Sequence, residues 1–134
     1  MSSRCFNGAY LKWWAGIDIR DILLANEEVS GITGGNVYPV VAPEGTEGNF
    51  ILYRRINYKR EYSQMGLTSD VARIEFLAIA DSYEESVTMA ALLDSTLTGK
   101  HTNEFGESLT FTLNDSEESF DDMKYIQTLT FEIK

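Results

Sequence analysis

The chain contains very little cysteine, histidine or proline: among 134 residues there are one cysteine, one histidine and two prolines. Cys5 has no second cysteine with which to form an internal disulfide. Together with the lone His101 it cannot supply the four ligands of an ordinary zinc site. The composition therefore excludes a disulfide scaffold and a structural zinc centre, and it fits a reducing cytosol.

Long apolar runs are also missing. No stretch approaches the roughly 20 residues needed to cross a bilayer, and residues 1–16 lack the uninterrupted apolar region of a secretory signal. We therefore expect a protein that has no membrane partner and works in the cytoplasm.

Bases are scarce, since 11 Lys and Arg face 21 Asp and Glu, for a formal charge of −10. Such a surface repels phosphate backbones and anionic lipid, so we expect no tight binding of nucleic acid. The exception is a basic cluster, Arg54, Arg55, Lys59 and Arg60, which lies among tyrosines. We expect these bases to meet acids of the same sheet or of a neighbouring copy. Arg54 and Arg55 point to opposite faces of a strand, so we expect that these two do not form one patch.

Patterns typical of catalysis or cofactor binding are incomplete. His101 has no evident nucleophile or second histidine as a partner. The glycine-rich stretch 31–48 lacks the Gly-Lys-Ser/Thr ending of a phosphate loop, and the acidic stretch 114–122 lacks the glycine and final glutamate of a calcium loop. The prediction is that the chain is no enzyme and has no catalytic, cofactor-binding or metal-binding residues, with 114–122 a solvated connection.

What the chain does contain is a clear strand followed by a clear helix in residues 69–99. The strand alternates, and one face is core: Ala72, Ile74, Phe76, Ala78 and Ala80. The other face is polar at first and then apolar at Leu77 and Ile79. That pattern predicts a far side partly covered by something else, such as another subunit.

The helix begins at a capping box, in which the Ser82 hydroxyl takes the amide hydrogen of Glu85 and the Glu85 carboxylate reaches back to the Ser82 amide. Its apolar arc is expected to comprise Val87, Ala90, Ala91, Leu93 and Leu97. Gly99 is expected to end the helix as a left-handed residue.

Other elements follow from the same patterns. Asp18 is expected to cap a first helix over 18–29, with Gly31 just past its end. Residues 49–59 read as a strand with Phe50, Leu52, Ile56 and Tyr58 on one face. The remaining segments are a short strand over 37–41, an exposed loop over 60–68, a loop around His101, and an antiparallel pair of strands over 107–114 and 123–134.

These elements predict one domain over residues 1–134, with an irregular segment over 1–16. The fold class is α+β, a mainly antiparallel β-sheet with two α-helices packed on one face. Trp13 and Trp14 are adjacent and cannot share one face of a regular element. Each therefore serves either the core or contact with a partner subunit.

Several motifs, in order, resemble a known family. They are Ile22-Leu23-Leu24 and Val29, Asn36-Val37-Tyr38-Pro39, Val41-Ala42-Pro43-Glu44-Gly45, Phe50-Ile51-Leu52-Tyr53, and the run from Ala72 to Ser86 with the helix ending in Leu97-Thr98-Gly99. Across residues 17–99 the chain resembles the tail-completion, or tail-to-head joining, proteins of long-tailed bacteriophages.

The resemblance implies a structural virion component of a phage or prophage, assembled in the bacterial host cytoplasm. It implies a ring of copies, six in the family, at the head-proximal end of the tail, with connector and tail-tube proteins as partners. Head-to-tail contacts between ring subunits need complementary surfaces. The candidate interface residues are Trp13, Trp14, Tyr53, Arg54, Arg55, Leu77 and Ile79.

Two alternatives remain open from the sequence. One is a tail terminator or minor tail protein of similar fold with a different ring partner. The other is a small acidic ligand-binding module or enzyme, whose mark would be a deep apolar pocket with converging polar groups.

Overall fold

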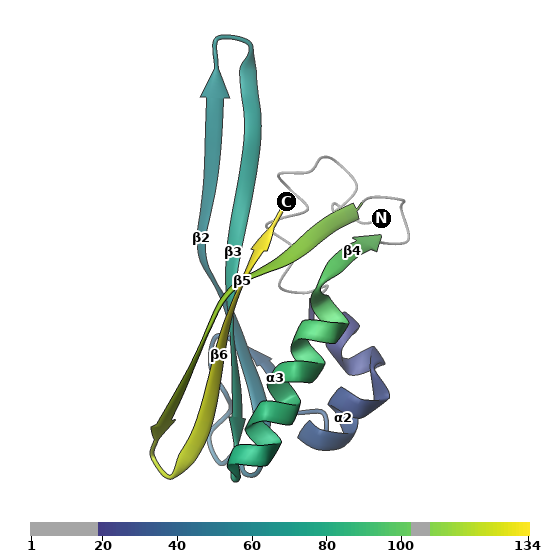
Figure 1. Cartoon of the computed structure of the whole chain (residues 1–134), viewed down its shortest axis with the longest axis vertical. Helices are drawn as coiled ribbons and strands as arrows, with labels where there is room; N and C mark the ends of the chain where they lie inside the picture. The colour runs from purple at the N-terminus through teal and green to yellow at the C-terminus, as the bar shows by residue number, and fades with distance from the viewer. Residues whose placement is uncertain (1–18, 103–107) are drawn as a thin grey trace.

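A computed structural model describes residues 19–102 and 108–134, and it shows a single six-stranded sheet (Figure 1). The strands are β1 (Val37–Pro39), β2 (Phe50–Ser63), β3 (Gly66–Ala80), β4 (Gly99–Thr102), β5 (Ser108–Asp121) and β6 (Lys124–Ile133). Their order across the sheet is β1-β2-β3-β6-β5-β4, with β1 parallel to β2 and all other neighbours antiparallel.

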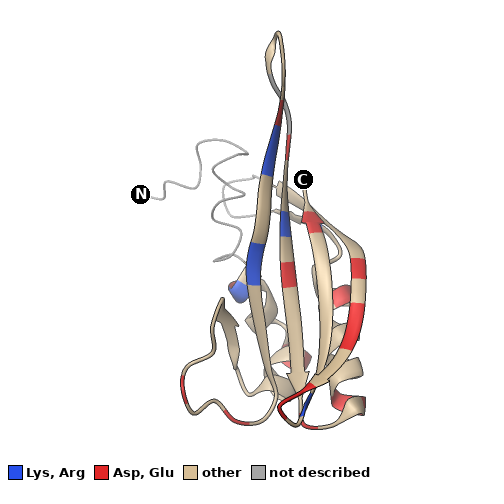
Figure 2. Ribbon diagram, turned by 90° about the vertical axis from the view of Figure 1, so that its left-hand side faces the viewer, with Lys and Arg blue, Asp and Glu red and all other residues tan. Residues whose placement is uncertain are grey.

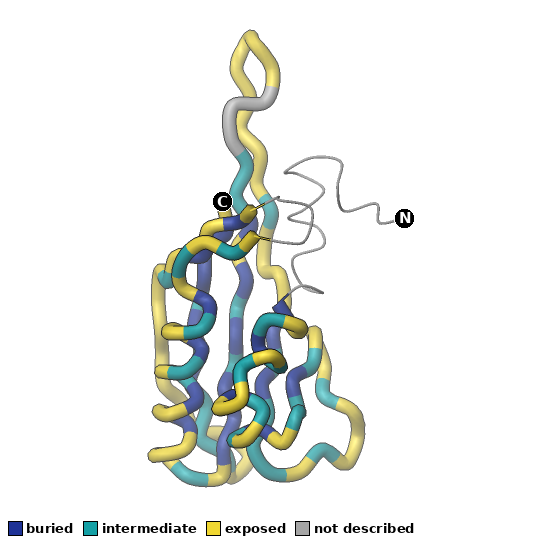
Figure 3. The backbone as a smooth tube through the Cα atoms, turned by 90° about the vertical axis from the view of Figure 1, so that its right-hand side faces the viewer, coloured by how far each residue is buried: buried dark blue, intermediate teal, exposed yellow. Residues whose placement is uncertain are grey.

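The described helical segments are residues 19–25, α2 (Glu27–Thr33) and α3 (Tyr83–Leu97). They cover one face of the sheet, as Figure 3 shows, and the predicted α+β class is confirmed. No helix in the described ranges is both long and apolar enough to cross a bilayer.

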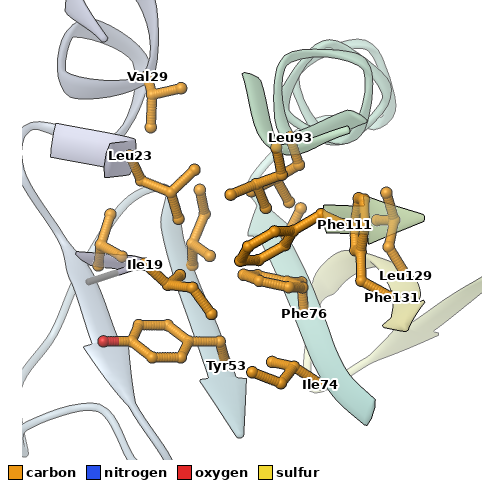
Figure 4. Close-up of a cluster of buried hydrophobic side chains, with 14 of the residues drawn as sticks. Ile19, Leu23, Val29, Tyr53, Ile74, Phe76, Leu93, Phe111, Leu129 and Phe131 are labelled. Atoms are coloured by element: carbon orange, nitrogen blue, oxygen red, sulfur yellow. The ribbon is translucent and has the colours of Figure 1, made fainter. Parts of the chain in front are cut away.

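The core forms between β3 and the helices, as the alternation predicted. The expected core residues of β3 are between 0% and 2% exposed. The Phe76 ring lies at the centre, 5.3 Å from the Phe131 ring in an edge-on arrangement and 5.9 Å from the Tyr53 ring (Figure 4). β3 is thus the central strand of the core, with β2 and β6 on either side and α3 packed against its buried face.

α3 begins where predicted, but it buries a different stripe. The Ser82 hydroxyl accepts from the Glu85 amide at 3.2 Å, whereas the Glu85 carboxylate bonds to the Ser82 hydroxyl at 3.1 Å and not to the amide. Of the predicted arc, Val87 is 41% exposed and Ala91 is also exposed. The buried residues are Ser86, Met89, Leu93 and Leu97.

The buried stripe of α3 differs from the predicted apolar arc partly because it includes a polar residue, Ser86. Its hydroxyl donates to the carbonyl of Tyr83 at 2.7 Å and lies 3.3 Å from the side-chain nitrogen of Gln127, so it is satisfied while fully buried. The end of α3 also differs from the prediction. Thr98 caps it without a left-handed conformation, and Gly99, at φ 119°, is already the first residue of β4.

The single helix predicted over 18–29 is wrong in two places. Helical residues 19–25 stop at Asn26, which has an extended backbone and caps α2 by accepting from the amides of Glu28 and Val29. α2 then runs through Gly31 and ends at Thr33; Gly34 is its C-cap, in a left-handed conformation with φ of 63° that suits glycine. The predicted cap Asp18 lies outside the described residues.

Asn26→Ala should destabilise the protein by about 0.5–2 kcal/mol, because the α2 cap is lost. The same side chain also donates to the Thr96 hydroxyl of α3 at 3.1 Å. Urea unfolding of Asn26→Ala beside Thr96→Ala separates the two roles, since the threonine variant loses only the link between helices. Equal losses for both variants would contradict the capping role.

Two predicted loops are strands. β2 and β3 continue through residues 60–68 and pair to the end, with Ser63 opposite Gly66 across a two-residue turn. β5 likewise runs through the acidic stretch to Asp121, and Asp122 and Met123 form the turn with φ of 49° and 63°. Charged side chains on both segments conceal their extended conformation, because an exposed strand need not alternate with apolar residues.

Candidate interaction surface

The predicted interface residues fall into three groups. Trp13 and Trp14 lie outside the described residues. Tyr53 is 3% exposed and packs in the core, where burial raises the pKa of its phenol, so it offers almost no surface to a partner. The remaining four residues, Arg54, Arg55, Leu77 and Ile79, lie on β2 and β3.

Leu77 and Ile79 belong to the face of the sheet opposite the helices, which Figure 2 views directly. Register places Leu52 beside Leu77, and Phe50 and Ile126 on either side of Ile79. Ile79 is 7% exposed and the other four residues are half-buried. The structure thus brings together an apolar strip, Phe50, Leu52, Leu77, Ile79 and Ile126, at one end of this open face.

Arg54 continues the open face beyond the apolar strip. Its Nε lies 3.2 Å from Oε1 of Glu75 on β3, and its side chain is 58% exposed, so the pair contributes little to stability. Arg55 is exposed too, but it is opposite Ile74 and therefore on the other face. The expectation that these two bases do not form one patch agrees with this register.

A hairpin arm projects beyond the sheet (Figure 1). The last pair between β3 and β6 is Ala72 with Ile133, so residues 59–71 of β2 and β3 extend past it; they are called the arm below. Near its tip, Tyr62 is 66% exposed and Met65 is 96% exposed. The sequence concealed the arm because its residues resemble a polar loop.

Side chains brace the root of the arm. The Tyr58 hydroxyl donates to Asp70 at 2.7 Å, and the Arg60 guanidinium lies 5.1 Å from the centre of the Tyr58 ring and donates to the same hydroxyl at 3.1 Å. The pKa of Tyr58 is raised, first by desolvation, although Arg60 opposes the shift. These contacts join both strands at the point where the rest of the sheet ends.

The opposite end of the molecule carries an exposed aromatic cluster, which sequence reasoning missed. The Tyr125 ring lies 6.0 Å from the Tyr83 ring and 4.9 Å from the Phe120 ring. Tyr83 and Phe120 are about half exposed, at 51% and 56%. Nearby, Glu118 accepts from Gln127 at 2.9 Å and from the Tyr83 hydroxyl at 2.7 Å.

These two bonds lower the pKa of Glu118, the bond from Gln127 having the larger effect. Tyr83→Phe should therefore move the pKa of Glu118 up towards its ordinary value, since one donor to the carboxylate is removed. A folded-state pKa below the unfolded one stabilises the protein above the unfolded pKa, and that contribution is lost as pH falls through the folded value. Carboxyl NMR titration measures the shift; an unchanged Glu118 pKa would contradict the bond.

The described surface holds no evident catalytic set. His101 is in β4 and not in a loop; its Nε2 lies 2.7 Å from the Leu97 carbonyl and its ring lies edge-on to Phe111 at 5.2 Å. A hollow of about 660 Å³ at the root of the arm is lined mainly by charges of both signs, including Lys59, Arg73 and Glu132. Within the described ranges, no three His, Cys, Asp or Glu side chains are grouped to hold a metal.

Comparison with known proteins identifies likenesses of fold. No protein-family model and no curated protein sequence matches the chain. A chain from the solved "virion of native gene transfer agent (GTA) particle" is similar with a TM-score of 0.70 and 14% identity, over 86% of this chain and 89% of that one. A second solved structure is similar with a TM-score of 0.54 and 9% identity, over 96% of this chain and 97% of the other. At these identities the likeness establishes a shared fold.

Proposed function

We propose that the chain is a structural virion component of a phage or prophage, and specifically a ring-forming tail-completion protein that joins head and tail. The observation that carries the proposal is the fold shared with a chain of the gene transfer agent virion, which extends over most of both chains. The sequence motifs in residues 17–99 resemble the tail-completion family independently of that likeness.

The shape of the surface supports assembly over catalysis. The arm projects beyond the sheet (Figure 1), the apolar strip lies on the open face, and the aromatic cluster includes Tyr83 of α3 on the helix side. A ring subunit needs at least two different surfaces for its neighbours, and more for the proteins above and below the ring. A small-molecule enzyme would instead concentrate its polar groups around one apolar pocket.

The proposed partners are other copies of the chain in a ring of six, the connector on the head side and the tail-tube protein on the other. The proposed location is the finished virion, after assembly in the cytoplasm of the bacterial host. The formal charge of −10 suits a channel through which DNA must slide without sticking.

The chain should bind duplex DNA weakly at physiological salt, because its acids repel the phosphates. Non-specific DNA-binding proteins reach dissociation constants of about 10⁻⁴–10⁻⁶ M in such buffers. Fluorescence anisotropy with a labelled duplex measures this affinity. Micromolar binding would contradict the proposed sliding surface.

A pull-down distinguishes the proposal from its alternatives. The tagged chain is mixed separately with the connector and tail-tube subunits of the same particle. A tail-completion protein retains both, whereas a tail terminator or minor tail protein retains only tail subunits. Retention of neither would overturn the assignment to the junction and favour a ligand-binding module.

A further inference from the structure

We propose that neighbouring copies join edge to edge, with the basic outer edge of β2 in one copy pairing antiparallel with the acidic outer edge of β5 in the next. The partner is thus a second copy of this chain, and the sheet continues from subunit to subunit. This inference rests on the proposed ring and specifies which surfaces close it.

Both edges are long because the outermost strands are short. β1 pairs with β2 only over Ile51, Leu52 and Tyr53, and β4 pairs with β5 only over residues 108–111. Within residues 19–102 and 108–134, no further strand pairs with 54–63 of β2 or with 112–121 of β5. Such edges present rows of backbone donors and acceptors that can bind another strand.

The two edges carry opposite charge (Figure 2). The β2 edge, residues 54–63, holds four bases and one acid, whereas the β5 edge, residues 112–121, holds four acids and no base. The charged residues of the proposed contact are all exposed: Arg54, Arg55, Lys59 and Arg60 on β2, and Asp115, Glu117, Glu118 and Asp121 on β5.

Opposite charges select one mode of association. Two β2 edges repel each other, as do two β5 edges, so like edges of two copies are kept apart. Protection against aggregation alone needs charge on each edge but no particular sign. The opposite signs therefore favour a head-to-tail contact between unlike edges, which is the kind that closes a ring.

Strand direction also fits. β2 is antiparallel to β3, β3 to β6, and β6 to β5, so β2 and β5 run in opposite directions within one copy. A rotation about an axis near the strand direction preserves these directions. β5 of one copy therefore meets β2 of the next in the antiparallel sense, which is the slightly more stable way to pair.

The offset between the charged stretches agrees with a closed ring. Register places Glu118, the middle of the acidic stretch, level with Ile51, whereas the middle of the basic stretch is Asn57. Six residues along a strand span about 20 Å, and four strands span about 19 Å across the sheet. Pairing the two stretches then tilts the strands by about 45° from the axis of the ring. This angle is at the upper end of the 35–45° typical of strands in closed barrels.

Charge reversal tests the inference. One variant carries Arg55→Glu with Lys59→Glu, and the other carries Asp115→Lys with Glu117→Lys. Sedimentation velocity up to roughly millimolar protein should show that the natural chain associates, that each variant alone associates at least tenfold more weakly, and that an equimolar mixture regains association. Glu84→Lys and Lys100→Glu, exposed but off both edges, are the matched controls and should associate as the natural chain does.

A carbodiimide that joins amines to carboxylates identifies the contact directly. In a mixture of unlabelled and ¹⁵N-labelled chains, mixed-isotope links should join Lys59 to acids of β5. Variants that associate normally, a mixture that does not recover, or chains that stay monomeric in every sample would each overturn the inference. The pull-down with connector and tail-tube subunits is independent of these edges, so the proposed function can survive that failure.

Discussion

Phe76→Ala is expected to lower the free energy of unfolding by about 3–5 kcal/mol, the usual cost of deleting a buried phenylalanine ring. Phe76 is 0% exposed on the central strand, and its ring lies between those of Tyr53 and Phe131. The total free energy of unfolding of such domains is about 5–15 kcal/mol. The variant should therefore melt roughly 10 °C or more below the natural protein.

Phe120→Ala is the matched control, because it removes the same ring from a site that is 56% exposed. It should cost about 1 kcal/mol or less, chiefly through the lost contact with Tyr125. Thermal and urea unfolding of both variants measure the difference. Comparable losses would contradict the position of β3 at the centre of the core.

Replacing residues 59–71 with Asn-Gly is expected to leave the domain folded and to abolish the joining of phage heads to phage tails. The cut preserves the pair of Tyr58 with Ala72, and Asn-Gly closes two antiparallel strands readily. Among the side chains that the structure describes, those of the hydrophobic core lie outside the removed segment, so the melting temperature should move by only a few degrees. Joined particles, counted by electron microscopy in a strain that supplies only the shortened chain, should fall at least tenfold.

A second variant separates the apolar tip from the arm itself. Tyr62→Ser with Met65→Ser keeps the hairpin and removes its two most exposed apolar side chains, which are 66% and 96% exposed. If the tip makes the contact, this variant should join particles as poorly as the shortened one. Normal joining by the shortened chain would show that the arm has no role in assembly.

The sequence was most informative where burial imposes a period. Alternation from Ala72 to Ala80 predicted the core face of β3, because one side of that strand meets the helices and the other does not. Ser82 and Glu85 predicted the start of α3, since a cap acts locally.

Local patterns failed where long-range contacts decide. The alternation predicted that Tyr58 shares a face with Phe50, and this prediction is wrong. A bulge between Arg55 and Asn57 moves Tyr58 to the side of buried Ala72, which is the opposite face. Nothing in residues 49–59 marks that bulge. The fully buried Ser86 shows the same limit, because its partner Gln127 is distant in the chain.

The candidate surface was only partly predictable for a related reason. The bases of β2 and the acids of β5 were visible as composition, but their meaning depends on strand order. Only the order β1-β2-β3-β6-β5-β4, with short strands outermost, makes them two opposite edges of one sheet. No hydrophobic period marks such edges, because exposed strands with charged residues do not pack against the core and need no alternating apolar side chains.

The proposed ring at the head–tail junction is tested most directly by a cryo-electron microscopy reconstruction of that junction in particles that contain this chain. We expect a closed ring of copies between connector and tail tube, with β2 of each copy beside β5 of the next. A junction without the chain, or one in which its copies do not touch, would rule out the proposed ring.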